Sequence, residues 1–447
     1  MIDESPLLWP QSASAVPAWL YAVLAVFNAV AALRTGKTWR QDPSAGRFPL
    51  ALISFGLYAA VAAAALGLFF FTGKLPGLPE SFKRFVDSSL NAATVCVLWW
   101  GFLFAFLLLR RRLVSPNSRP HVLNLPALAF LVALSDGQFS GLVWQPDNFA
   151  IVLIVAATLF HLYFALSSAV RNDDRIARGL PPLEGEKRER EKVLVWPDLV
   201  YIELIAMIVV MTGLLIWSLA LPAPLEAPAD PLHTPNPAKA PWYFVGLQEL
   251  LVYFDPWLAG VVIPGILALG LIALPYLDPS PEGSGYYSLA SRPRVAAAFL
   301  FGFFGLWLLL IVIGVFFRGP NWAFYGPFES RDVPKIESTR ARPLSTWLHA
   351  PGAASERPSE EGRRSGTVAI LLREWPGPAF LLAYFLILPH ALQRGPTRAF
   401  RRRVGAVRYH AAMFLFLFML LIPIKMLLRE ACAVNYILYL PEWGWNI

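Results

Sequence analysis

The sequence predicts an all-α, polytopic integral membrane protein with about ten transmembrane helices. Of its 447 residues, 56% are hydrophobic and only 15% are charged, whereas about 25% of residues are charged in ordinary soluble domains. The mean hydropathy is +0.51. The apolar residues gather into long runs, and a run of roughly 20 such residues is long enough to cross a bilayer as a helix.

Ten segments meet this criterion, and two of them contain features that disturb a helix. The fourth is short and contains Pro126 and Ser135, so it is the weakest span. The ninth contains Trp375-Pro376-Gly377-Pro378, and proline removes a backbone donor and breaks the helical ladder. Its first turn is therefore expected to be a separate interfacial piece. The ten spans cover about residues 16–33, 48–72, 91–109, 122–136, 149–170, 199–221, 257–277, 295–317, 367–392 and 409–428.

The basic residues predict the orientation. Alternate loops hold 23 of the 38 lysines and arginines, and short cytoplasmic loops are enriched in these residues. Both termini are therefore expected on the outer, periplasmic side. The tightest cluster lies between the last two spans, and an anionic-lipid surface is the weaker reading of it. The loops that carry this bias are 34–47, 110–121, 171–198, 278–294 and 393–408.

Changes in composition divide the chain into five regions. Residues 1–170 form a five-helix membrane region of unknown role, and 171–198 are a charged cytoplasmic linker. Residues 321–366 form an outward loop whose end is rich in Pro, Ser, Arg and Glu, and this end is expected to be flexible. Residues 367–447 form a two-helix membrane region with an outward tail. The remaining segment, 199–320, carries the motif.

This motif lies between the sixth and seventh spans. Prolines are closely spaced from Pro222 to Pro241, which predicts a stiff, extended path. The run from Trp242 to Phe254 is apolar with one polar pair, and it predicts a short helix near the outer interface. The stretch begins with Ala229-Asp230-Pro231-Leu232-His233-Thr234-Pro235 and continues through Lys239-Ala240-Pro241-Trp242-Tyr243-Phe244.

These residues resemble the C-terminal domain of cytochrome b, called subunit IV when it is a separate chain. The resemblance covers about residues 199–320, and it implies a subunit of a cytochrome bc-type quinol:cytochrome c oxidoreductase. In that family this loop walls the quinol-oxidation site on the outer face. By resemblance Pro241, Trp242, Tyr243 and Phe244 line the quinone site. Tyr243 can donate to a quinone carbonyl, and Trp242 either packs against the quinone ring or, as the favoured interpretation, anchors the loop at the interface.

One departure from the family motif concerns the proton acceptor. The family has Pro-Glu-Trp-Tyr, but here Pro241 stands where the glutamate should be. A proton acceptor needs a carboxylate or imidazole within reach of the substrate hydroxyl. Glu249, two helical turns beyond Trp242, is the nearest replacement, and His233 and Asp230 are further candidates. The alternative for Glu249 is an interfacial carboxylate or an ion pair with Lys239.

The chain is expected to carry no redox centre. No two of its six histidines share a span at the separation that haem-binding cytochrome b requires, and Cys-x-x-Cys-His is missing. Only His390 and His410 lie near enough to each other in the predicted topology to be weighed as haem ligands, and a haem there is the minor reading. Metal-ligand clusters are also missing, so we expect no metal site in this chain.

The resemblance implies that the cofactors lie in partner subunits. Haem b would be carried by a cytochrome b subunit, the iron–sulfur cluster by a Rieske-type protein and haem c by a c-type cytochrome. Quinol would be the substrate, and the membrane would be an energy-transducing one, such as the bacterial inner membrane. Membrane lipids and quinone are therefore expected partners, and nucleic acid is not.

Two rival functions stay open. The missing glutamate is also compatible with a degenerate quinol site in a structural scaffold of a respiratory or photosynthetic assembly. A transporter ranks last, because transporter sites usually lie near the middle of the bilayer on broken helices and often between repeats. Here the polar motif is interfacial, and no repeat is visible.

Overall fold

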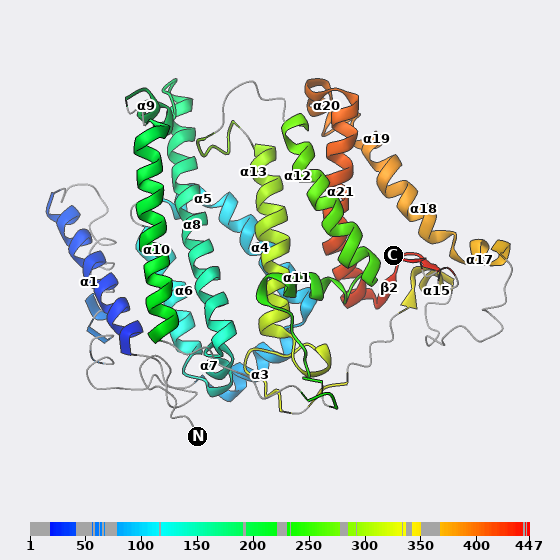
Figure 1. The fold of residues 1–447 in the computed structure, drawn as a ribbon, viewed down its shortest axis with the longest axis horizontal. Helices are drawn as coiled ribbons and strands as arrows, with labels where there is room; N and C mark the ends of the chain where they lie inside the picture. Colours follow the sequence, from blue (N-terminus) through cyan, green and yellow to red (C-terminus); the bar gives the residue numbers. More distant parts are fainter. Residues whose placement is uncertain are drawn as a thin grey trace. The chain divides into compact units, whose positions relative to one another are not determined.

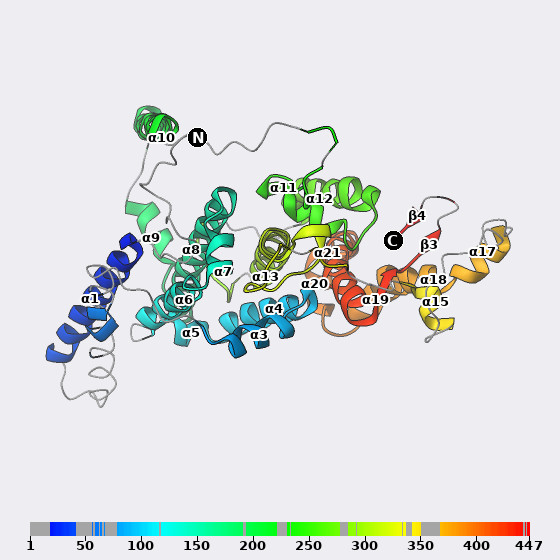
Figure 2. The same ribbon diagram turned by 90° about the horizontal axis from the view of Figure 1, so that it is seen from below.

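The computed structural model is mostly helical, as the two views of its ribbon show (Figure 1, and Figure 2 from below). The structure describes residues 18–41, scattered positions between 56 and 67, and 78–115, 118–190, 194–220, 230–232, 234–277, 285–291, 293–332, 334–336, 342–349, 367–440, 443 and 445–447. Most of the predicted second span, the flexible segment 351–366 and the candidate proton acceptor His233 lie outside these residues.

The described residues form two compact units. One contains residues 1–152, 236–282 and 297–447, and the other contains residues 153–235 and 283–296. The segment 199–320 contributes to both. The motif loop is divided as well, because Asp230 belongs to the second unit and Trp242 to the first.

The larger unit holds most of the helices. In its N-terminal part these are α1 (Ala18–Gln41), α3 (Glu80–Ser89), α4 (Ala92–Leu108), α5 (Arg110–Leu113), α6 (Arg119–Ala133), α7 (Gly137–Val143) and the start of α8 (Pro146–Ala177). The central helices are α11 (Trp242–Leu250), η2 (Leu258–Val262), α12 (Ile263–Leu277), the end of α13 (Pro293–Phe299), η3 (Leu300–Leu308), α14 (Leu309–Val312), η4 (Ile313–Phe317) and η5 (Pro320–Trp322). The first four residues of α13 belong to the second unit.

The C-terminal part adds helices and two short sheets. The helices are α15 (Leu344–His349), α17 (Thr367–Glu374), α18 (Pro376–Leu382), η6 (Ala383–Ile387), α19 (Leu388–Leu392), α20 (Arg398–Val404) and α21 (Ala406–Cys432). Strand β1 (Arg342–Pro343) pairs in parallel with β2 (Val434–Tyr436), and β3 (Tyr439–Leu440) pairs antiparallel with β4 (Trp445–Asn446).

The second unit contains the rest of α8, then α9 (Leu183–Arg190), η1 (Val195–Leu199) and α10 (Val200–Ala220). Helix α8 continues to Ala177, beyond the predicted end of the fifth span, so the first charges of the predicted linker lie on a helix. The buried Asn172 side chain there donates to Glu184 Oε2 at 2.7 Å and accepts from the Leu183 N–H at 3.0 Å. The linker is thus partly folded back on the end of α8.

The described residues contain five helices that are long and apolar enough to cross a membrane, or up to eight if each bent helix pair counts as one span. These eight correspond to the third through tenth predicted spans. In the predicted first span, the described apolar helix Ala22–Leu33 is shorter than a spanning helix. Ten spans are therefore not confirmed, although the protein is an integral membrane protein of helical type.

The bent pairs occur where the sequence contains helix-breaking residues. Helices α6 and α7 meet at 112°, and Asp136 Oδ1 caps α7 by accepting from Gln138 N and Phe139 N. Helix α17 and the helix that follows it meet at 59°, at Trp375 before Pro376. The predicted break at the start of the ninth span is therefore confirmed.

One hydrophobic core joins the central helices to the flanking spans. Buried side chains from α4, from α11 and its following turn, from the helix ending at Phe317, from η6 and from α21 belong to a single cluster. Trp99 of α4 donates from Nε1 to the Phe304 carbonyl at 3.0 Å. That carbonyl lies in the wide-turn segment η3, where the helical ladder is irregular. The spans at 91–109 and 409–428 therefore extend the scaffold of the central segment.

Candidate functional site

Helix α11 is the centre of the candidate site. It starts directly after Pro241. The pyrrolidine ring of Pro241 holds φ at −50°, a value that suits the residue before a helix. Figure 1 shows α11 running crosswise to α12. The helix ends at Leu250, and residues 251–254 continue as turns. The short helix predicted from the apolar pattern is thus present, four residues shorter than expected.

A glycine lets α11 pack closely on the helix that ends at Phe317. A Cβ atom added at Gly314 would lie 2.3 Å from Val245 Cγ1, a distance that no side chain tolerates. Gly246 on the facing helix lies against Ile311, where an added Cβ would meet Cγ1 at 3.3 Å. The two backbones therefore approach each other, and this approach places Glu249 next to the end of the second helix.

Glu249 is completely buried and fully hydrogen-bonded. Arg318 forms a two-pronged ion pair with it, from Nη2 to Oε1 at 2.8 Å and from Nε to Oε2 at 3.0 Å. Tyr253 Oη donates to Oε1 at 3.0 Å and Trp322 Nε1 donates to Oε2 at 3.0 Å. A carboxylate has about four acceptor positions, so these four donors occupy all of them.

The surroundings of the Glu249–Arg318 pair also determine the protonation state of Tyr253. Burial and the negative charge of Glu249 raise the pKa of Tyr253 well above its usual value. Its hydroxyl therefore stays protonated and acts as a donor to the carboxylate. The ion pair predicted as an alternative, with Lys239, does not form, since Lys239 Nζ instead donates to the Val315 carbonyl at 2.7 Å.

The segment before α11 is held firmly in place. Gln248 accepts from Ala240 N at 2.9 Å and donates to the Ala238 carbonyl at 2.8 Å. Asn236 donates to Asn321 Oδ1 at 2.8 Å and accepts from the Asn321 N–H at 2.6 Å. The stiff path expected from the prolines is therefore also fixed by side-chain bonds, and residues 236–241 have one defined course into the helix.

The four predicted quinone-site residues lie together at the start of α11. Pro241, Tyr243 and Phe244 are exposed, with Tyr243 49% and Phe244 51% accessible, and Trp242 is partly buried. Their side chains continue an aromatic row along the neighbouring helix. Trp242 contacts Trp307 at 6.3 Å between ring centroids, and Phe303 stacks on Trp307 at 5.2 Å. Phe299 stacks on Phe303 at 5.5 Å.

The other candidates are placed less closely. Asp230 is exposed, accepts from the Leu232 N–H at 2.8 Å and belongs to the second unit. The rings of His390 and His410 lie 4.8 Å apart, and His390 Nδ1 contacts the Leu386 carbonyl at 2.8 Å. Among the described residues, no group of three or more His, Cys, Asp or Glu side chains could hold a metal ion.

Sequence reasoning missed Arg318, Tyr253 and Trp322 as partners of Glu249. The available signal was an arginine directly after an apolar run, where a buried cation needs a counter-charge. The partner stands 69 residues earlier in the chain. Only the packing of α11 on the helix that ends at Phe317 brings the two together.

Comparison with known proteins assigns this segment to a family. Residues 228–328 match the family model described as cytochrome b(C-terminal)/b6/petD, so this segment is similar to the cytochrome b C-terminal domain. All members of the Glu249 network lie inside the match. The predicted sixth span, at 199–221, lies upstream of it.

One curated relative is the menaquinol:cytochrome c reductase cytochrome c subunit of Geobacillus thermodenitrificans. It is 35% identical over 92 residues, which are 20% of this chain and 37% of the relative. The chain thus spans well under half the length of that relative. No solved structure matches the chain significantly.

Proposed function

Because residues 228–328 match the cytochrome b C-terminal family model, we propose that this chain is a haem-free membrane subunit of a quinol:cytochrome c oxidoreductase. In this proposal α11 and the segment before it form part of the quinol-oxidation site on the outer face of a bacterial inner membrane. The observation that carries the proposal is the exposed aromatic surface formed by Tyr243, Phe244, Trp242 and Trp307. Its inclined aromatic rings give the apolar, edge-and-face environment that suits a quinone ring.

The chemistry expected of this chain is binding and orientation. The Tyr243 hydroxyl can donate to a quinone oxygen, and the aromatic row can guide an isoprenoid substrate from the bilayer towards α11. Electrons would pass to an iron–sulfur cluster and to haem b held by a Rieske-type protein and a cytochrome b subunit, with a c-type cytochrome as a further partner. This chain contributes the wall of the site, and its own residues carry no electron.

We propose an anchoring role for Glu249 in place of direct proton acceptance. All of its acceptor positions are occupied, and it is closed off from the exposed face where Tyr243 lies. It holds α11 against Arg318 and so determines where the aromatic residues stand. The proton would then leave the quinol through another group of the assembled complex or through water.

The first test concerns Tyr243. In the purified complex, Tyr243→Phe should reduce kcat/KM for quinol oxidation about fivefold to tenfold, the equivalent of one hydrogen bond. Tyr276→Phe is the matched control, because Tyr276 is an exposed tyrosine at the far end of α12. Equal rates for Tyr243→Phe and wild type would remove Tyr243 from the site.

The second test separates the two roles of Glu249. If it anchors α11, Glu249→Gln lowers the thermal stability of the complex and the turnover rate, and the pH profile of the remaining activity keeps its shape. If it accepts the proton, the profile loses one ionisation. The stability falls in either case, because Arg318 loses its counter-charge, so the shape of the pH profile is the reading that decides. Glu203→Gln, at an exposed carboxylate on α10, is the control for loss of a charge.

The structural-scaffold alternative has a distinct outcome. A scaffold subunit with a degenerate site would co-purify with haem-carrying partners but leave quinol turnover unchanged in both Tyr243→Phe and Trp242→Leu. A complex purified through this chain should contain haem b and an iron–sulfur protein under the favoured proposal. A particle without any b-type haem would contradict both.

A further inference from the structure

A second polar surface lies away from α11, in the connection between α19 and α21. Residues 393–408 include six arginines, namely Arg394, Arg398, Arg401, Arg402, Arg403 and Arg408. No acidic residue occurs between Glu374 and Glu430. Among the described residues, no carboxylate forms a salt bridge with these six arginines.

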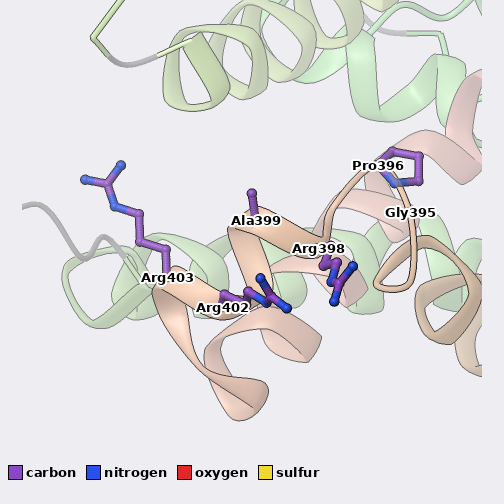
Figure 3. A pocket seen from close by; sticks show the side chains of 6 residues that line it. All are labelled: Gly395, Pro396, Arg398, Ala399, Arg402 and Arg403. Atoms are coloured by element: carbon purple, nitrogen blue, oxygen red, sulfur yellow. The ribbon is translucent and has the colours of Figure 1, made fainter.

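The arginines surround two open hollows. One, of about 590 Å³, is lined by Arg398, Arg402 and Arg403 with three smaller residues, and the other, of about 470 Å³, is lined by Arg394, Arg398, Arg401 and Arg402 with Gln393. Arg398 and Arg402 line both. Figure 3 shows their guanidinium groups on the same side of α20, while Arg403 points away.

The enrichment of cytoplasmic loops in lysine and arginine accounts for the positive charge of this loop. It does not account for the way in which the side chains of Arg398 and Arg402 come together. Arg398 and Arg402 stand four residues apart on α20, and like charges at this spacing destabilise a helix. Convergence without a counter-charge therefore costs free energy that a bound anion would remove. Guanidinium groups also match the oxygens of a phosphate in geometry.

The loop is held in a fixed shape rather than left free. Tyr409 is fully buried, donates to the Pro389 carbonyl at 2.9 Å and contacts Thr397 Oγ1 at 2.7 Å. Val404 is buried and Phe400 partly buried on the inner side of α20. Four of the six arginines are therefore presented by a short amphipathic helix whose apolar side faces the protein.

One polar atom in the hollow has no partner. Gln393 Oε1 is buried and accepts no hydrogen bond within the described part of the chain. Because this oxygen is closed off from solvent, Gln393 forms part of the wall of the second hollow. The groups that the hollow offers to an anion are the guanidinium groups of the arginines.

The position of this loop in the membrane protein favours one class of phosphate-containing ligand. The loop joins two candidate membrane spans, so it lies at a membrane surface. Apolar side chains are exposed on the helices on both sides of it, with Ile387 65%, Leu386 58% and Val407 85% accessible. A ligand with an anionic head and acyl chains meets both features, whereas free phosphate meets only the first.

We propose that residues 393–408 form a binding site for an anionic phospholipid, with the phosphate held by Arg398 and Arg402. This site is separate from the proposed quinol site. Helix α20 lies at one end of α21, whereas the turn that follows α11 contacts Arg429 near the other end of α21, where β2 begins (Figure 1). The lipid would fix α20 and the ends of α19 and α21 at the cytoplasmic surface.

The test uses the intact purified complex, washed free of lipid and titrated with phosphatidylglycerol while bound lipid is counted by native mass spectrometry. Arg398→Gln and Arg402→Gln should each weaken binding about fivefold. Arg408→Gln is the matched control: it removes one exposed charge of the same loop but lines neither hollow, so its affinity should stay within about twofold of wild type.

Two further titrations identify the source of the phosphate. Phosphatidylcholine should bind much more weakly than phosphatidylglycerol, and inorganic phosphate should not displace the lipid. Displacement by inorganic phosphate would overturn the lipid assignment. An equal loss of lipid affinity in all three arginine variants would contradict a specific site, because the positive charge of the loop alone would then explain the binding.

Discussion

At the scale of single residues, Glu249 and Arg318 are the most consequential pair in the candidate site. Both are nearly or fully buried, and each supplies the other's counter-charge. Removing one partner of such a pair leaves an uncompensated buried charge, which costs about 3–5 kcal/mol. The position of α11, and with it the aromatic surface at its start, therefore depends on these two buried side chains.

Lys239 gives a prediction about pH. Most of the residue is at the surface, but its ammonium group lies against the Val315 carbonyl, and burial together with the nearby charge of Arg331 lowers its pKa to about 8. In the unfolded chain its pKa returns to about 10.4. The folded state thus holds fewer protons between these values, and the cost of burying the ammonium is relieved as pH rises through this range.

The expected result is a change in relative stability. Lys239→Met abolishes this contribution, so the melting temperature of wild type should rise relative to Lys239→Met as pH increases from 7 to 10. Thermal unfolding of the two proteins in parallel measures it. A difference that is constant with pH would show that the ammonium is not held as described.

At the scale of elements, the fit of α11 to its neighbour can be tested at Gly314. Gly314→Ala introduces the Cβ atom that meets Val245 Cγ1, and overpacking of this kind costs about 1–3 kcal/mol. We expect a lower melting temperature and lower quinol turnover. Val245→Ala in the same chain should restore part of both, because it removes the atom that clashes.

The control for this prediction is another glycine in a helix. Gly265 on α12 has open space around it, with no heavy atom within 4 Å of an added Cβ. Gly265→Ala should therefore be neutral or slightly stabilising, since alanine is the better helix former. Equal destabilisation by Gly265→Ala and Gly314→Ala would refute the close contact.

At the scale of the whole molecule, the predicted orientation can be tested by labelling the cysteines that the chain already contains. Cys432 is exposed at the end of α21 and Cys96 is buried, so Cys432 should react with a membrane-impermeant maleimide added to intact cells. Ala399→Cys on α20, in a Cys432→Ser background, should react only after the cells are broken. Labelling of Ala399→Cys from outside would reverse the orientation.

The sequence alone determined the helical membrane class, most span positions, the break before Pro376 and the family resemblance of the central segment. These features depend on local composition and on short motifs, and both can be recognised from residues that are neighbours in the sequence. The same holds for the grouping of Pro241 through Phe244, because neighbours in sequence stay neighbours on a helix.

Only the tertiary structure decided what surrounds Glu249. Its partner Arg318 is 69 residues away, and the choice of Arg318 over Lys239 depends on how closely two helices approach at Gly314. In the same way, the arginines of the last connection were visible as a charge cluster, but the convergence of Arg398 and Arg402 on one side of α20 was not. Contacts between distant segments follow from packing in three dimensions, which no local pattern records.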